Sequence, residues 1–233
     1  MSVDGQSARD RILTKVRAAL GTPSRALPPA PAGRGLFPPL DAATLAAEFG
    51  KQLLAVSGVF HRAASVPEAR EILRGIAEAA QAQQLGVASG ATVRAVCESL
   101  PARLLGSHGD GHALQDLDIA VTGCDCLIAR TGSVVLTARS AAGRASSVLP
   151  PVHVVVAGKN QLVADLADAL QVLDGRYRSS AQGWPSMMTV ITGPSRTADI
   201  EKTLVLGAHG PKQLHVVLLD SPVEPPVSDG GAA

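Results

Sequence analysis

Between residues 41 and 219, helical segments alternate with short runs of β-branched residues, and this alternation limits the chain to a few architectures. Helix–strand alternation indicates a largely parallel sheet that is sandwiched by helices, because parallel neighbours need crossover connections. The sequence therefore predicts an α/β fold, a three-layer α/β/α sandwich. Helical patterns cover 41–56, 67–84, 91–99 and 161–173, and strand patterns cover 58–63, 86–89, 118–121, 126–129, 133–138, 152–157, 188–192 and 214–219, with 103–116 expected to be a loop.

Both ends of the chain differ from this central region. Residues 7–20 have the spacing of an amphipathic helix that Ser7 could cap, and 21–40 contain six prolines, which disfavour regular structure. The tail 221–233 is rich in Pro, Gly and Asp, a composition typical of disorder. We expect three parts: an N-terminal helix and Pro-rich linker at 1–40, a single domain at 41–220, and a disordered tail at 221–233.

The composition of the chain argues against two classes of partner, nucleic acids and membranes. The chain has 233 residues, a net charge of +1 and 46% hydrophobic residues, but only five aromatic residues, namely three Phe, one Tyr and one Trp. Few rings and a near-neutral charge argue against a nucleic-acid surface. No apolar run approaches the roughly 20 residues that cross a bilayer, and no signal peptide is visible at the N-terminus. Three cysteines form no paired framework, so we expect a cytoplasmic protein without a membrane partner.

The loop after strand 188–192 carries the strongest signal of a ligand site. Gly193 permits a tight turn, Ser195 and Thr197 offer hydroxyl groups, and Arg196 offers a planar guanidinium that suits a carboxylate or phosphate. Asp199 could bind a hydroxylated ligand or a cation. The alternative is an ordinary strand-to-helix turn, in which a hydroxyl caps a helix and Asp199 lies in its first turn.

A second segment, Thr131-Gly132-Ser133, places a glycine between two hydroxyl groups directly before a strand. Such a segment permits close approach of a ligand to the backbone, and it is equally compatible with a hairpin turn between strands 126–129 and 133–138. We expect these three residues to approach the 193–197 loop at the carboxyl edge of the sheet, where α/β proteins bind ligands.

Three histidines have different expected roles. His209, between Gly207 and Gly210, is the candidate for ligand contact or proton transfer, because imidazole titrates near neutral pH. His153 and His215 lie within strand patterns and are expected to be structural. With His209 and Gly210 added, the expected pocket takes a small carboxylate or phosphate that Arg196 anchors.

Metal and cofactor signals are weak. His108, Asp110 and His112 lie in a Gly-rich loop without a second ligand cluster, and Cys124 with Cys126 falls short of the four thiolates of a typical iron–sulfur centre. Phosphate-binding and dinucleotide-binding glycine motifs are missing from the sequence. We therefore expect no metal and no cofactor bound by this chain.

Three pieces of the chain resemble the LUD-domain family in the family's order. They are Val121-Thr122-Gly123-Cys124-Asp125 running into 131–136, the Leu149-to-Val156 segment with His153, and the stretch 188–220. The resemblance implies the three-layer fold of the NagB/RpiA/CoA-transferase-like group. It also implies a role in oxidising L-lactate to pyruvate together with separate proteins, one of which carries an iron–sulfur centre. The family usually has a carboxylate directly before Thr131, whereas this chain has Arg130.

Two functions with a role in chemistry remain open from the sequence, beside a ligand sensor without chemistry that the sequence does not separate from the first. The first is a subunit or accessory protein of a lactate utilization system, because the chain lacks an evident electron acceptor of its own. The second is a stand-alone enzyme of the CoA-transferase-like or sugar-phosphate-isomerase-like group, which the fold suggests by analogy. Arg130 weakens the second, since acyl transfer of that type uses a carboxylate nucleophile. Whether the chain is catalytic alone stays open.

Overall fold

The structure is a computed structural model that describes residues 7–20, 37–105, 114–197, 205–207 and 209–224. The chain divides into two units, Met1–Pro38 and Pro39–Ala233. In the first unit the helix α1 (Ala8–Leu20) forms as the sequence predicts, and the Ser7 hydroxyl accepts a hydrogen bond from the Asp10 backbone N–H at 3.2 Å. This helix buries no residue.

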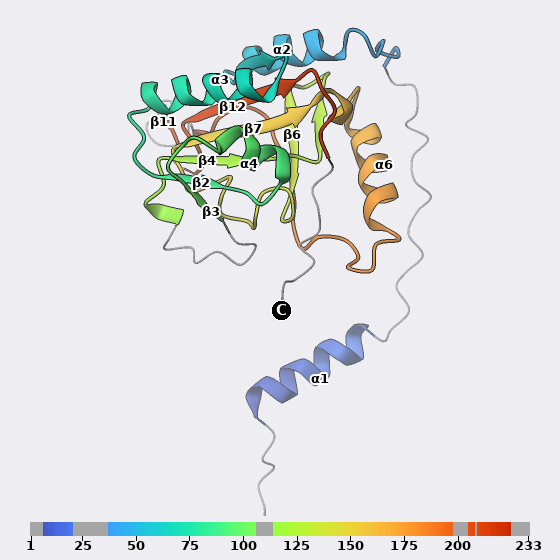
Figure 1. Cartoon of the computed structure of the whole chain (residues 1–233). Helices are drawn as coiled ribbons and strands as arrows, with labels where there is room; N and C mark the ends of the chain where they lie inside the picture. Colours follow the sequence, from blue (N-terminus) through green and yellow to red (C-terminus); the bar gives the residue numbers. More distant parts are fainter. Residues whose placement is uncertain (1–6, 21–36, 106–113, 198–204, 208, 225–233) are drawn as a thin grey trace, which may run out of the picture. The chain divides into compact units, whose positions relative to one another are not determined.

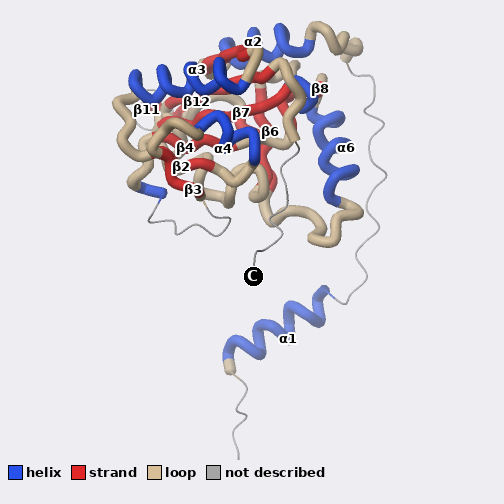
Figure 2. The backbone as a smooth tube through the Cα atoms, viewed as in Figure 1, coloured by secondary structure: helices blue, strands red, loops and turns tan. Residues whose placement is uncertain are grey.

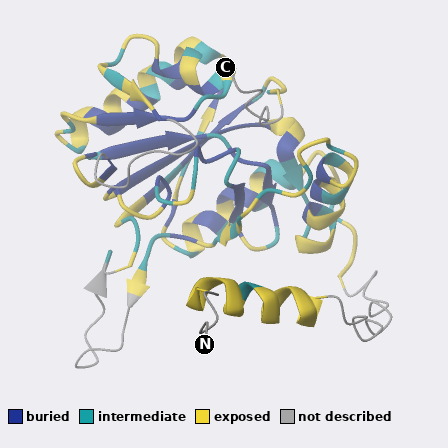
Figure 3. Cartoon of the chain, turned by 90° about the horizontal axis from the view of Figure 1, so that it is seen from below, coloured by how far each residue is buried: buried dark blue, intermediate teal, exposed yellow. Residues whose placement is uncertain are grey.

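The second unit is built on a six-stranded sheet, here called sheet A, in which every neighbouring pair is parallel. The central strands are buried along their whole length, as Figure 3 shows, because helices or further strands cover both faces. The strand order is β1 (Val59–Ala63), β12 (Gln213–Leu219), β7 (Val152–Gly158), β4 (Ile119–Thr122), β2 (Leu85–Val87) and β3 (Ala102–Leu104).

Two helices cover one face of sheet A (Figure 1). Helix α3 (Val66–Ala79) begins where the sequence predicts, because the Ser65 hydroxyl accepts from the Glu68 N–H and a proline occupies the first turn. Helix α4 (Ala91–Cys97) follows β2. Their apolar faces pack on the alternate valines, leucines and isoleucines of the sheet, with Leu73 and Val96 fully buried.

The opposite face is covered by helix α2 (Leu45–Ala55) and by a second sheet, here called sheet B. Phe49 and Leu53 of α2 are fully buried against this face. In sheet B the β8–β5 pair is parallel and the β5–β6 and β6–β9 pairs are antiparallel. Figure 2 shows β6, β8 and helix α6 on the right of the view. Its strand order is β8 (Leu162–Val163), β5 (Cys126–Ile128), β6 (Ser133–Thr137) and β9 (Met188–Ile191).

Helix α6 (Leu166–Tyr177) packs on the outer face of sheet B through Ala169, Leu173 and Tyr177. The sequence predicts this helix at 161–173, which is too early. Residues Lys159–Gln161 form a short 3-10 turn (η1) that leads into β8, and the Asp165 side chain then caps α6 by accepting from two backbone N–H groups. The cap decides the start of the helix, whereas apolar spacing alone cannot.

The predicted fold class, an α/β sandwich with a largely parallel sheet, is confirmed. The sequence did not predict that sheet B and α2 share one covering layer, with α6 outside it. It also missed β3, which lies in the segment expected to be a loop, and the two-stranded hairpin of β10 (Arg196–Thr197) and β11 (Val205–Leu206). Within the described part of the chain, no helix has the length and apolar character to span a bilayer.

Candidate functional site

The two hydroxyl-rich segments predicted from the sequence meet at one end of sheet B. The Thr131 and Ser133 hydroxyl oxygens are 2.7 Å apart, and the Ser133 hydroxyl is also 2.7 Å from that of Thr192. Antiparallel pairing of β6 with β9 aligns Val134 with Ile191 and so brings the start of one strand to the end of the other. The result is a continuous chain of three hydroxyl groups, of which Thr131 and Thr192 are exposed.

Both glycines of these segments press against the C-terminal end of α2. Gly132 has φ of 61°, and a methyl group added there would lie 2.3 Å from the Leu53 backbone nitrogen. Gly193 has φ of 77°, and its added methyl would lie 2.3 Å from the Val56 carbonyl oxygen. Each position therefore requires glycine both for its backbone conformation and for space. A tight turn and close packing against the backbone of α2 explain why glycine occupies both positions.

Arg196 also contacts the end of α2. Its guanidinium donates a hydrogen bond to the Ser57 hydroxyl, which follows the last turn of the helix. Ser57 has φ of 64°, the left-handed conformation that commonly ends helices. A cation near a helix C-terminus is stabilised by the partial negative charge there. Arg196 is exposed.

The segment before β12 completes this cluster of loops. The Ser195 N–H donates to the Pro211 carbonyl at 2.9 Å, and the His209 N–H lies 3.4 Å from the Ser195 hydroxyl. Gly210 lies against Ser195, and the His209 side chain is exposed. For Thr197 the structure describes the backbone as part of β10, and Asp199 lies outside the described residues. The cluster thus contains Thr131, Gly132, Ser133, Gly193, Ser195, Arg196, His209 and Gly210.

The cluster does not lie at the carboxyl edge of the sheet, where the sequence predicts it. Its loops lie beside Ser57 and Pro211, which precede β1 and β12, so they border the amino edge of sheet A and not its carboxyl edge. The physical reason is that Thr131 and Thr192 belong to the turns of sheet B, whose strands do not continue sheet A. Arg130 is half-buried directly beside the cluster, and its backbone N–H donates to the Ala164 carbonyl at 3.1 Å.

A buried charge cluster that the sequence did not predict joins sheet B to α6. The Asp125 carboxylate is fully buried, and its Oδ1 accepts from Arg176 Nη1 and from the Tyr177 hydroxyl, both at 2.6 Å. The Arg139 guanidinium lies 4.9 Å from the centre of the Tyr177 ring. Asp125 Oδ2 is buried and has no hydrogen-bond partner among the described residues. The sequence contains one signal for this cluster. Asp125 lies between Cys124 and Cys126, and a carboxylate buried with them requires a cation from elsewhere in the chain.

A second buried polar pair lies on the face of sheet A that carries sheet B. His153 Nε2 is 2.9 Å from the Thr122 hydroxyl, and both residues are fully buried. Burial lowers the pKa of His153 to about 4, so the ring is neutral at pH 7. In the part of the chain that the structure describes, no group forms a hydrogen bond with Nδ1 of His153. The structural role expected for His153 agrees with this location.

The cysteines do not offer a cluster site. All three are buried and free. Burial raises the pKa of Cys97 and of Cys126 to about 12, and raises that of Cys124 well above its ordinary value, so the thiols stay protonated. Cys124 lies between the sheets, whereas Cys126 lies under α6. Protonated thiols on opposite sides of sheet B do not fit an iron–sulfur centre.

In the described ranges no group of three or more His, Cys, Asp or Glu side chains could hold a metal ion. The histidine-rich segment 108–112 falls outside those ranges.

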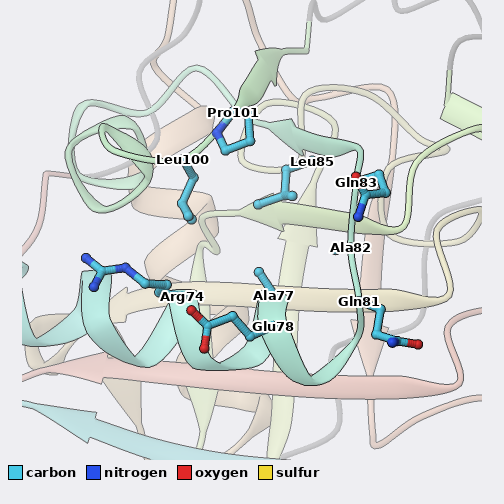
Figure 4. Close-up of a pocket in the computed structure, with 9 residues that line it drawn as sticks. All are labelled: Arg74, Ala77, Glu78, Gln81, Ala82, Gln83, Leu85, Leu100 and Pro101. Atoms are coloured by element: carbon cyan, nitrogen blue, oxygen red, sulfur yellow. The ribbon is translucent and has the colours of Figure 1, made fainter.

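One cavity of about 300 Å³ lies away from these groups, between α3 and the strands β2 and β3 (Figure 4). Ala77, Leu85 and Leu100 point into it, so its floor is apolar. The cavity contains none of the site residues predicted from the sequence. It is lined by Arg74, Ala77, Glu78, Gln81, Ala82, Gln83, Leu85, Leu100 and Pro101.

The parallel sheet A, the added sheet B and the loop cluster on α2 define an α/β protein with a composite second layer. The LUD domain model matches residues 46–219, which is most of the chain, and the chain belongs to this family. A crystal structure of a DUF162 family protein from Deinococcus radiodurans has the same fold, with a TM-score of 0.57 and 21% identity over 78% of this chain and 99% of that one.

Among curated proteins, the chain is similar to proteins named lactate utilization protein C. It is 33% identical over 103 residues to the protein of Macrococcus caseolyticus, which covers 44% of each chain. It is 34% identical over 118 residues to that of Halalkalibacterium halodurans, which covers 48% of this chain and 51% of the relative. These matches span about half the length of the curated relatives.

Proposed function

We propose that this protein acts in lactate utilization, as a subunit or accessory protein of a system that oxidises L-lactate to pyruvate. The observation that carries this proposal is the similarity, at 33–34% identity, to proteins named for lactate utilization. Membership of the LUD domain family supports it.

The electron acceptor of that reaction belongs to a partner in this proposal. Oxidation of a 2-hydroxy acid removes two electrons, which a cofactor must accept. The three thiols of this chain are buried and protonated, so their chemistry does not suit cluster ligation. We therefore assign the iron–sulfur centre to a separate protein of the same system, and place this chain in the cytoplasm with it.

The loop cluster beside α2 is the proposed site for a small carboxylate or phosphate. Arg196 supplies an exposed guanidinium, the Thr131 and Thr192 hydroxyls are exposed at the end of their hydrogen-bonded chain, and His209 is exposed nearby. A carboxylate can accept from a guanidinium and from hydroxyl groups at once. Arg130 adds a positive charge beside the same cluster, so the site favours anions.

The direct test is affinity for the anion. Arg196→Ala removes a charge-assisted hydrogen bond worth roughly 1.5–3 kcal/mol, so the affinity for lactate is expected to fall about ten- to hundredfold. Calorimetric titration of both proteins with lactate, pyruvate and phosphate measures this change. Arg62→Ala is the matched control, because Arg62 is an exposed arginine paired with Asp220 at the other end of β1. Equal affinities of wild type and Arg196→Ala would refute the site.

The assembly is tested separately, by isolating the tagged full-length chain from cells grown on lactate. A stoichiometric iron–sulfur protein in the complex, and lactate oxidation by the complex but not by the chain alone, are the expected results. Acyl-CoA transfer or phosphosugar isomerisation by the purified chain would instead support a stand-alone enzyme. Arg130 disfavours that alternative, since this position carries no carboxylate that could act as nucleophile.

A further inference from the structure

Two imidazole rings face each other on sheet A. They come from strands that supply none of the three hydroxyl groups of the loop cluster. His61 Nε2 of β1 and His215 Nδ1 of β12 are 3.1 Å apart, and the ring planes differ by 10°. The strands are parallel neighbours whose register pairs Val59 with His215 and His61 with Val217, so the two histidines are diagonal neighbours on one face of the sheet. Both side chains are only half-buried, and β1 is an edge strand of the sheet, so ions in solution can reach the pair.

The hydrogen bonds around the pair set which nitrogen atoms carry protons. Gln213 Oε1 lies 3.2 Å from His215 Nε2, so it can accept the Nε2–H and leave a lone pair on Nδ1, facing His61. That lone pair accepts the Nε2–H of His61 across the 3.1 Å separation. An ion that binds between the rings takes the place of this proton, which moves to Nδ1 of His61, and both rings then ligate the ion as neutral imidazoles.

The separation of the two nitrogen atoms suits a shared ion. Nitrogen ligands lie about 2.0–2.1 Å from Zn²⁺, and two of them in neighbouring coordination positions are therefore roughly 3 Å apart. For both lone pairs to converge on one ion, the two half-buried rings need only small changes in their side-chain torsions. Gln213 then has the role of the outer hydrogen-bond partner that usually orients a ligating histidine.

We propose that His61 and His215 form a binding site for a divalent first-row transition metal, with Zn²⁺ as its representative and water in the remaining coordination positions. The ion joins the edge strand β1 to β12. Because the site lies outside the loop cluster, it does not depend on the proposed lactate function, and its failure would leave that function untouched.

Calorimetric titration of the full-length chain with Zn²⁺ at pH 7.5 tests the proposal. We expect one ion per chain with micromolar affinity, and at least a tenfold loss of affinity in His61→Asn and in His215→Asn. Gln213→Ala should weaken binding to a smaller extent, since it removes only the orienting hydrogen bond. Zn²⁺ should raise the melting temperature of wild type but not of the two histidine variants.

The other histidine-rich segment of the sequence provides the control. His108→Asn combined with His112→Asn should leave the site intact, and melting curves in EDTA show whether each variant folds. Should His215→Asn fail to fold, His61→Asn on the exposed edge strand still decides the question. Unchanged Zn²⁺ binding in His61→Asn, loss of binding in the His108/His112 variant, or affinity no better than millimolar in wild type would each overturn the proposal.

Discussion

At the scale of single residues, Gly132 is the position where the structure most strictly requires glycine. Gly132→Ala would force a methyl group to within 2.3 Å of the α2 backbone at a φ of 61°. Backbone cannot move as a flexible side chain does, so we expect a loss of more than about 2 kcal/mol in the free energy of unfolding. Urea denaturation measures it.

Gly75→Ala is the matched control for that substitution. Gly75 lies inside α3, and an added methyl would meet no atom within 4 Å. Alanine is favoured over glycine in helices by about 1 kcal/mol, so this variant should be more stable than wild type. A Gly132→Ala protein as stable as wild type would show that α2 is not held against the Thr131–Ser133 turn.

The buried ring of His153 leads to a prediction of how the free energy of unfolding depends on pH. The unfolded chain binds a proton on this ring with the ordinary pKa of 6.5, whereas the folded protein binds it only near pH 4. As pH falls between these values the unfolded state takes up the proton first, so stability present above pH 6.5 is lost on the way to pH 4. At about 1.4 kcal/mol per pKa unit, the loss from this ring is roughly 3 kcal/mol.

The measurement is urea denaturation of wild type and His153→Gln across this pH window. Glutamine can still hydrogen-bond to Thr122 but does not titrate, so its curve should be flatter by the His153 contribution. Parallel curves for the two proteins would contradict a neutral buried ring in the folded state.

At the scale of elements, α6 is attached to sheet B by a buried ion pair. Arg176→Met leaves the Asp125 carboxylate buried without its cation, and such a change typically costs about 3–5 kcal/mol. Arg178→Met is the control at the C-cap of the same helix, because Arg178 forms an exposed pair with Asp174 that is worth about 0–1 kcal/mol. Equal urea midpoints for the two variants would mean that apolar packing alone holds α6.

The success of sequence-based prediction differs among the elements for identifiable reasons. Helix α3 has a capping serine, a proline in its first turn and a continuous apolar stripe, so local pattern and packing agree. The sequence places the start of α6 too early because Leu162 and Val163 extend its apolar stripe, yet these two residues form β8 beside β5. Strand β3 has three residues and pairs on one side only, so almost no local signal marks it.

At the scale of the whole molecule, the sequence predicted that the 131–133 segment lies beside the end of strand 188–192, but not where in the fold this contact lies. Hydroxyl groups at 131–133 and the 193–197 loop are adjacent, because both lie at strand ends of one sheet. These residues lie at the amino edge of sheet A because sheet B is separate from sheet A. No local sequence pattern indicates that separation. The partners of Asp125 lie about fifty positions away in the sequence, so only the folded chain shows them.

The division of the chain into two units leads to a last prediction, for limited proteolysis. Arg25 and Arg34 are trypsin sites inside the proline-rich stretch, whose six prolines should keep the backbone out of helices and sheets. Trypsin should therefore cut there first and leave a stable fragment that begins at Ala26 or Gly35. Because α1 buries no residue, losing it removes no described apolar packing, and the fragment should unfold at the same urea concentration as the intact chain. A fragment that unfolds at a clearly lower concentration would show that the first 38 residues belong to the folded domain, and it would move the domain boundary toward the N-terminus.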